Sequence, residues 1–176
     1  MNFIKTKING LYLIEPNLIK DKRGAFRRVF CQKELKSKKI NFNIKQTNIS
    51  ENKHKFTLRG FHYQIGKDSE DKIITCISGK IYNVVLDLRK KSKTYTKWIS
   101  FNLSSQNKLS LLVPKGCANA WLSLKDNTSL LYMHSQFYNP NNEKRIRYND
   151  NYFNIHWPHK PIVISKKDNL VEDYIE

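Results

Sequence analysis

Short runs of β-branched and aromatic residues, separated by turn-forming residues, dominate the middle of this 176-residue chain. The runs that we interpret as strands are 72–78, 80–89, 97–104, 109–114 and 128–138. Short strands at this spacing, without alternating helical segments, are typical of an antiparallel sandwich or barrel. We expect a hairpin at Gly79–Lys80, where two runs meet, and one short helix at 32–40.

The length of the chain suits one compact domain spanning residues 1–176, and no repeat or low-complexity linker divides it. No apolar run approaches the roughly 18 residues that a membrane span needs, and the first residues lack the apolar stretch of a signal peptide. We therefore expect a cytoplasmic protein that binds no membrane. Cys31, Cys76 and Cys117 lack the spacing of a disulfide framework or a zinc knuckle, which favours reduced thiols.

Positive charge is the strongest compositional signal, with 32 Lys and Arg against 15 Asp and Glu and a formal net charge of +17. Such an excess favours an anionic partner or a lysine-rich solvated surface. The lysines are scattered along the chain, and no helix-turn-helix, zinc-finger or RNA-recognition motif accompanies them. A nucleic-acid partner is therefore not expected, although a basic binding module stays open as an alternative function.

The segment LRGFHYQ, residues 58–64, places polar residues inside a strand-like run. In an ideal strand His62 and Gln64 share one face, whereas Arg59 points to the other. Arg59 and His62 could therefore reach one ligand only if the strand is irregular. Gly60 lies between them, and a glycine inside a strand often marks a bulge. A histidine in such a strand is also compatible with an ordinary core position, so this segment alone does not define a site.

Many segments in a fixed order extend the pattern over nearly the whole chain. They are DKRGAF (21–26), QTN (46–48), LRGFHYQ (58–64), Lys72, VVLDLRKKSKTYTKW (84–98), VPKGCANAW (113–121), Tyr132, YNPNNE (138–143), YND (148–150), WP (157–158) and SKKD (165–168). Together they resemble the dTDP-4-dehydrorhamnose 3,5-epimerase family. The resemblance implies an all-β, cupin-like double-stranded β-helix (jelly roll) with short flanking helices, a homodimer, and an NDP-4-keto-6-deoxy sugar as the substrate.

The resemblance also implies proton transfer without a metal or other cofactor. Metal-binding cupins usually present two histidines two residues apart, and His62 has no such neighbour. By resemblance, His62 is the catalytic base and Asp168 orients its imidazole. Lys72 would stabilise the negative charge that develops on the carbonyl oxygen, and Tyr132 would return a proton to the other face. Each side chain also has an ordinary structural interpretation, such as a barrel aromatic for Tyr132.

Guanidinium groups suit the diphosphate of such a substrate, because they bind phosphate oxygens through two parallel hydrogen bonds. Arg23 and Arg59 are the candidates. The resemblance assigns further substrate contacts to Gln46, Asn48, Glu143 and Lys167, and for Lys167 a solvated surface position is the alternative.

Three positions depart from the family pattern. Asn83 and Asn119 occupy positions where the family usually has an aspartate and a histidine that form a second pair near the sugar, and Arg28 stands where a glutamate commonly contacts the base. Two asparagines can hydrogen-bond the substrate but cannot titrate near neutral pH. We therefore expect a 3,5-epimerase with an altered pocket, with C3-only epimerisation or another substrate, such as a GDP-linked heptose, as the alternatives.

Overall fold

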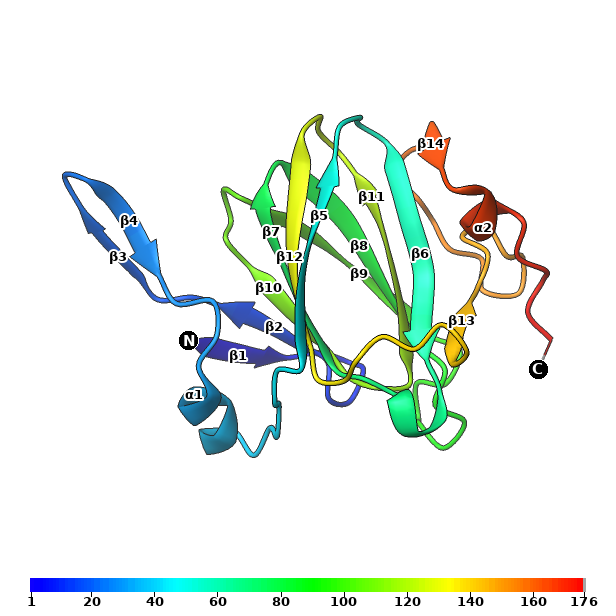
Figure 1. Ribbon diagram of the computed structural model, residues 1–176, viewed down its shortest axis with the longest axis horizontal. Coiled ribbons are helices and arrows are strands. Elements are labelled where there is room, and N and C mark those ends of the chain that lie inside the picture. Colours follow the sequence, from blue (N-terminus) through cyan, green and yellow to red (C-terminus); the bar gives the residue numbers. More distant parts are fainter. Residues whose placement is uncertain (176) are drawn as a thin grey trace.

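The computed structural model describes residues 1–175, and its main body is two sheets packed face to face (Figure 1). The first sheet has the strand order β1 (Asn2–Lys5), β2 (Tyr12–Glu15), β10 (Ser110–Val113), β7 (Lys72–Ser78), β12 (Thr128–His134) and β5 (Gln46–Asn52). The second has the order β13 (Glu143–Arg145), β6 (Thr57–Gln64), β11 (Cys117–Ser123), β8 (Lys80–Asp87) and β9 (Trp98–Ser104). Neighbouring strands in both series are antiparallel. This is the jelly-roll architecture that the sequence predicts.

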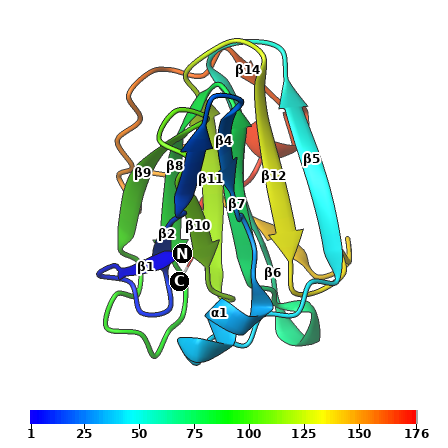
Figure 2. The same cartoon turned by 90° about the vertical axis from the view of Figure 1, so that its left-hand side faces the viewer.

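Smaller elements flank the two sheets. They are the hairpin of β3 (Leu18–Asp21) and β4 (Gly24–Arg27), the helices α1 (Gln32–Ser37) and α2 (Lys166–Asn169), the 3₁₀ turn η1 (Gly66–Asp68), and β14 (Val163–Ile164), which pairs parallel to β6. The β3–β4 hairpin extends away from the main body, on the side opposite the C-terminal segment (Figures 1 and 2). The predicted helix at 32–40 is confirmed as the shorter α1.

Apolar side chains pack between the sheets and also against their outer faces. Between the sheets, Ile74 and Leu130 of the first meet Val85 and Trp121 of the second. The outer face of the second sheet is covered by the chain after β13, through residues such as Phe153. Strand β8 is therefore buried on both faces, which explains its nearly continuous apolar sequence.

The predicted hairpin at Gly79–Lys80 is wrong. Strand β7 pairs with β10 and β12 in the first sheet, whereas β8 pairs with β11 and β9 in the second. The chain crosses from one sheet to the other at Gly79, which has a φ of 75°. A Cβ atom there would collide with Thr128, so this position suits a glycine for its conformation and for its space.

Candidate active site

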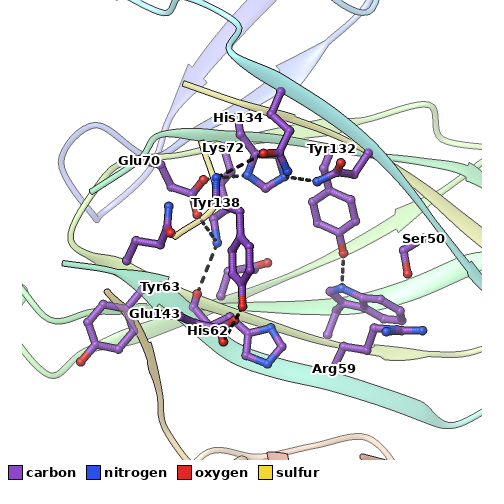
Figure 3. Close-up of a pocket in the computed structure, with 15 residues that line it drawn as sticks. Ser50, Arg59, His62, Tyr63, Glu70, Lys72, Tyr132, His134, Tyr138 and Glu143 are labelled. Atoms are coloured by element: carbon purple, nitrogen blue, oxygen red, sulfur yellow. Dashed lines mark hydrogen bonds and ion pairs between the residues drawn. The ribbon is translucent and has the colours of Figure 1, made fainter. Parts of the chain in front are cut away.

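A cavity of about 360 Å³ lies between the two sheets (Figure 3). Strands β5, β7 and β12 contribute side chains from the first sheet, and β6, β11 and β13 contribute them from the second. The sequence-predicted residues that line it are Gln46, Asn48, Arg59, His62, Lys72, Asn119, Tyr132 and Glu143. Residues far apart in the sequence thus converge on one space, which could hold a small organic ligand.

Arg59 and His62 both reach this cavity because β6 is irregular between them. In the register with β11, Trp121 pairs with Arg59 and Asn119 pairs with His62, so the two strands advance by different numbers of residues. The predicted bulge at Gly60 is confirmed. Gly60 has a φ of 109°, and β11 passes so close that no other side chain would fit.

His62 is held by the carboxylate of Asp168, 106 residues later in the chain. The distance between His62 Nε2 and Asp168 Oδ1 is 2.7 Å, and Asp168 is only 4% exposed. Burial alone would raise the pKa of Asp168, but the hydrogen bond and charge of His62 and the charge of Arg145 outweigh burial and lower it. An ionised carboxylate only accepts hydrogen bonds. Neutral His62 therefore carries its hydrogen on Nε2, and Nδ1 can take a proton.

Arg145 is a member of this site that sequence reasoning missed. Its Nη1 atom donates to the same Asp168 oxygen at 2.8 Å, and its Nη2 atom donates to Glu143 Oε2 at 2.6 Å. Arg145 also pairs with His62 in the register of β13 and β6. Nothing in the local sequence marks this arginine, because its partners lie on other elements.

Tyr132 lies on the first sheet, across the cavity from His62 (Figure 3). Its hydroxyl oxygen accepts a hydrogen bond from Trp121 Nε1. Burial raises the pKa of Tyr132 far above its ordinary value, and the hydrogen bond from Trp121 offsets only part of that effect. Tyr132 is therefore a neutral hydroxyl at physiological pH. Because the indole supplies the hydrogen of their shared bond, the phenolic hydrogen of Tyr132 is free to be donated.

Lys72 lies at the start of β7 and forms an ion pair with Glu70, with 3.0 Å between Lys72 Nζ and Glu70 Oε1. The other Glu70 oxygen lies 2.8 Å from Nδ1 of His134. Glu70 and His134 line the cavity but were not predicted from the sequence. The Lys72 side chain is only 12% exposed, so the structure places this lysine inside the cavity rather than in solvent.

The two asparagines that depart from the family pattern contact each other. Asn119 Nδ2 donates to Asn83 Oδ1 at 2.8 Å and to the Val84 carbonyl at 3.1 Å. Asn119 thus uses both amide hydrogens inside the protein and keeps only its carbonyl oxygen for other partners. Asn83 is fully buried behind Asn119 and does not line the cavity, and its Nδ2 atom has no partner among the described residues.

Polar groups near Arg59 and Glu143 widen the set of possible ligand contacts. Arg59 Nε donates to Asn52 Oδ1 at 2.9 Å, which orients the guanidinium. The Tyr138 hydroxyl donates to Glu143 Oε2 at 3.2 Å, so an aromatic ring and a carboxylate lie together in the cavity wall. Gln64 instead stabilises neighbouring loops, because its side-chain amide forms hydrogen bonds with the backbone of Asp68, Phe137 and Asn139.

Besides Asn83, three predicted substrate-binding residues do not line this cavity in the single chain. Arg23 is on the β3–β4 hairpin, where it pairs with Asp21, and Arg28 pairs with Glu34. Lys167 lines a second hollow, whose wall also includes His62 and Asp168. The structure therefore brings Lys167 close to the His62–Asp168 pair but does not bring Arg23 or Arg28 there.

The side chains of residues 1–175 give little support for metal-dependent catalysis or for catalysis by Cys76 or Cys117. No group of three or more His, Cys, Asp or Glu side chains in this range is arranged to hold a metal ion. All three cysteines are free thiols, and burial raises the pKa of Cys76 to about 11 and that of Cys117 to about 12. Those two thiols stay protonated and are poor nucleophiles. Neither helix of the described range is long and apolar enough to cross a membrane.

Comparison with known proteins agrees with this geometry. Residues 5–175 match the family model described as dTDP-4-dehydrorhamnose 3,5-epimerase. A protein of that name from Shigella flexneri is 37% identical over 182 residues, which cover 100% of this chain and 97% of the relative. The crystal structure of a dTDP-4-dehydrorhamnose 3,5-epimerase from Bacillus anthracis, with TDP and PPi bound, has a TM-score of 0.95 and 32% identity, covering 98% of this chain and 99% of that one.

A second solved structure is similar over nearly the same range. It is a dTDP-6-deoxy-D-glucose-3,5-epimerase from Legionella pneumophila in complex with dTDP-4-keto-L-rhamnose. Its TM-score is 0.89 at 32% identity, and the match covers 95% of this chain and 89% of that one.

Proposed function

Because this chain belongs to the dTDP-4-dehydrorhamnose 3,5-epimerase family, we propose that it epimerises a dTDP-linked 4-keto-6-deoxy sugar at C3 and C5. One observation carries the proposal. His62, hydrogen-bonded to Asp168, and Tyr132 line opposite walls of one cavity, with Lys72 between the two sheets as a cation. A base on one face, an acid on the other and a cation for the oxygen are what an epimerisation beside a ketone requires.

The reaction begins when His62 Nδ1 takes a proton from a carbon next to the ketone. The electrons of that C–H bond form an enolate, and the ammonium of Lys72 stabilises the negative oxygen. Asp168 stabilises the imidazolium that forms on His62. Tyr132 then donates its phenolic proton to the opposite face of the carbon, which inverts the configuration. Trp121 Nε1 stabilises the resulting phenolate through its hydrogen bond, until solvent exchange restores both protonation states.

The nucleotide end of the substrate would bind at the polar side of the cavity. Arg59 of β6 supplies the positive charge on this side, and Gln46 and Asn48 of β5 also line the cavity. A guanidinium fixed by Asn52 suits the oxygens of a diphosphate. Tyr138 offers an aromatic face for the base, and Glu143 offers a hydrogen-bond acceptor. Asn119 would present its carbonyl oxygen to the sugar.

A homodimer would complete the binding site. The β3–β4 hairpin leaves Ile19 66% exposed, Phe26 68% exposed and the Arg23 side chain 90% exposed (Figure 1). Apolar residues on a hairpin that leaves the body are typical of an interaction surface. In the proposed dimer the hairpin of one chain lies against the other chain and brings Arg23 to the diphosphate. Arg28 at the base of the hairpin and Lys167 are proposed as further phosphate contacts.

The dimer is tested by sedimentation of the wild-type protein and of a Phe26→Asp variant. We expect a dimer for the wild type and a monomer for the variant, with loss of affinity for dTDP in the monomer. A wild-type monomer that binds dTDP with full affinity would contradict this part of the proposal.

Solvent exchange tests the activity itself. In D₂O the wild type should introduce deuterium at both C3 and C5 of dTDP-4-keto-6-deoxyglucose. His62→Ala should abolish label at both carbons and keep the affinity for dTDP, because His62 does not contact the nucleotide. His156→Ala, a histidine outside the cavity that packs against Trp98, is the matched control and should retain full exchange.

The same experiment separates the alternatives. Label at C3 alone would replace the proposed reaction by C3-only epimerisation. Exchange on a GDP-linked 4-keto sugar, without exchange on the dTDP-linked one, would change the nucleotide. The absence of exchange on every dTDP-, GDP- and CDP-linked 4-keto sugar would refute the enzymatic assignment of this cavity.

A further inference from the structure

A second histidine–carboxylate pair lines the cavity on the wall that carries Tyr132. His134 is the last residue of β12, and Glu70 precedes β7. The distance between His134 Nδ1 and Glu70 Oε2 is 2.8 Å, and the side chains are 14% and 7% exposed. Figure 3 shows the pair beside Lys72, with Tyr132 on the same strand. The epimerisation mechanism assigns this pair no role.

Glu70 holds two cavity groups at once. Its Oε1 atom contacts Lys72 and its Oε2 atom contacts His134. Lys72 and His134 are also direct partners in the register of β7 and β12, where paired side chains lie next to each other. Burial alone would raise the pKa of Glu70, but the hydrogen bond from His134 and the charge of Lys72 outweigh burial and lower it. One ionised carboxylate therefore fixes an ammonium and an imidazole side by side.

The carboxylate also determines what His134 can offer to a ligand. Because an ionised Glu70 only accepts hydrogen bonds, neutral His134 carries its hydrogen on Nδ1 and has a lone pair on Nε2. Nε2 accepts a long hydrogen bond from Asn48 Nδ2, at 3.4 Å, which a ligand hydroxyl would replace. Stacking on Tyr132, with 5.9 Å between ring centroids and 20° between planes, further orients the imidazole. His134 thus presents a hydrogen-bond acceptor next to Lys72, which can only donate.

An adjacent donor and acceptor match one particular feature of a 4-keto sugar. The ketone oxygen at C4 accepts a hydrogen bond, and the hydroxyl at C3 can donate one. Lys72 would serve the first and His134 the second. On the basis of the function proposed above, we propose that His134, oriented by Glu70, binds the C3 hydroxyl of the sugar and so makes the site specific for a ketone with a neighbouring hydroxyl group.

The test compares two sugar nucleotides that differ in this hydroxyl. Dissociation constants are measured by calorimetry for dTDP-4-keto-6-deoxyglucose, for its 3-deoxy analogue and for dTDP. All measurements use the His62→Ala background, so that the ligand is not turned over. Adding His134→Ala should weaken binding of the hydroxylated sugar about fivefold to tenfold, the loss of one hydrogen bond. Binding of the 3-deoxy analogue and of dTDP should be unchanged.

Two further variants distinguish recognition from a structural role. His134→Gln should recover part of the affinity, because its amide can donate to Glu70 and accept from the hydroxyl. His156→Ala serves as the control histidine. Equal losses for both sugars would overturn the proposal, since they would show that His134 only supports Lys72 and Glu70. Unchanged affinity for the hydroxylated sugar would overturn it as well.

Exchange by the otherwise wild-type enzyme, run in parallel, separates this proposal from the proposed function. If the wild type exchanges deuterium but His134→Ala weakens binding of both sugars equally, only the role of His134 is refuted. Neither exchange nor binding of any 4-keto sugar would refute the proposed function, and the role of His134 with it.

Discussion

Gly60 is the backbone position on which the meeting of Arg59 and His62 depends, and Gly60→Ala is the sharpest test of that dependence. The residue has a φ of 109°, a conformation that L side chains rarely adopt. A Cβ atom would lie 2.5 Å from the Asn119 carbonyl oxygen and 2.7 Å from Ala120 Cα. Both neighbours are backbone atoms in the middle of β11, so they cannot rotate away.

Two costs follow from this geometry. The positive φ destabilises an L residue by roughly 1–2 kcal/mol, and overpacking against a fixed backbone typically adds roughly 1–3 kcal/mol. We therefore expect Gly60→Ala to lower the free energy of unfolding by about 2–5 kcal/mol. Any relief by moving β6 away from β11 would displace His62, because His62 is the register partner of Asn119. Deuterium exchange at the sugar should then fall at least about tenfold, since catalysis depends on sub-ångström placement.

The assay is urea unfolding followed by tryptophan fluorescence, with Gly66→Ala as the matched control. Gly66 also has a positive φ, 62°, but a Cβ atom there meets nothing within 4 Å. The control should therefore lose only the conformational part, about 1–2 kcal/mol, and keep full exchange activity. Equal losses of unfolding free energy in the two variants would refute the argument that contact with β11 makes Gly60 necessary.

Two further predictions follow from the same structure. Tyr132→Phe should lower net epimerisation on the order of 100-fold while His62 still exchanges the substrate proton with solvent, and equal loss of both activities would contradict an acid role for Tyr132. Buried Asp87 accepts hydrogen bonds from Arg89 and from two hydroxyls, which outweigh its burial and hold its pKa far below the ordinary value. Its contribution to stability is therefore present above about pH 4 and lost on acidification. In acid titrations of the unfolding free energy, Asp87→Asn should show a shallower slope, and an unchanged slope would contradict this account.

Local patterns in the sequence predict many of the strands but not which strands pair with each other. The predicted strand at 72–78 coincides with β7, and the runs at 97–104 and 109–114 contain β9 and β10. Strands β5 and β11 were not predicted from the sequence. Strand β5 is a polar edge strand with mostly exposed side chains, and β11 mixes small residues with Trp121, so neither has a clear apolar alternation. The crossing between sheets at Gly79 looks like a hairpin because the partners of β7 lie elsewhere in the chain.

The site residues also fall into those that the sequence predicts and those that depend on strand pairing. His62, Lys72, Tyr132 and Asp168 follow from an ordered set of motifs, and the structure places the first three in one cavity, with Asp168 hydrogen-bonded to His62. Glu70, His134 and Arg145 could not be predicted. Each acts through partners on other strands, and only the register of β7 with β12 and of β13 with β6 brings them together.

Asp168, whose carboxylate orients His62, is joined to the two sheets through two short elements. Asp168 lies on the four-residue helix α2, which follows the two residues of β14 that pair with β6. Opening so small a unit costs less free energy than unfolding the two sheets. In mild denaturant or on warming, enzymatic activity should therefore fall reversibly while the circular dichroism of the sheets stays native. The useful temperature range of such a catalyst would be determined by its last short helix rather than by its core.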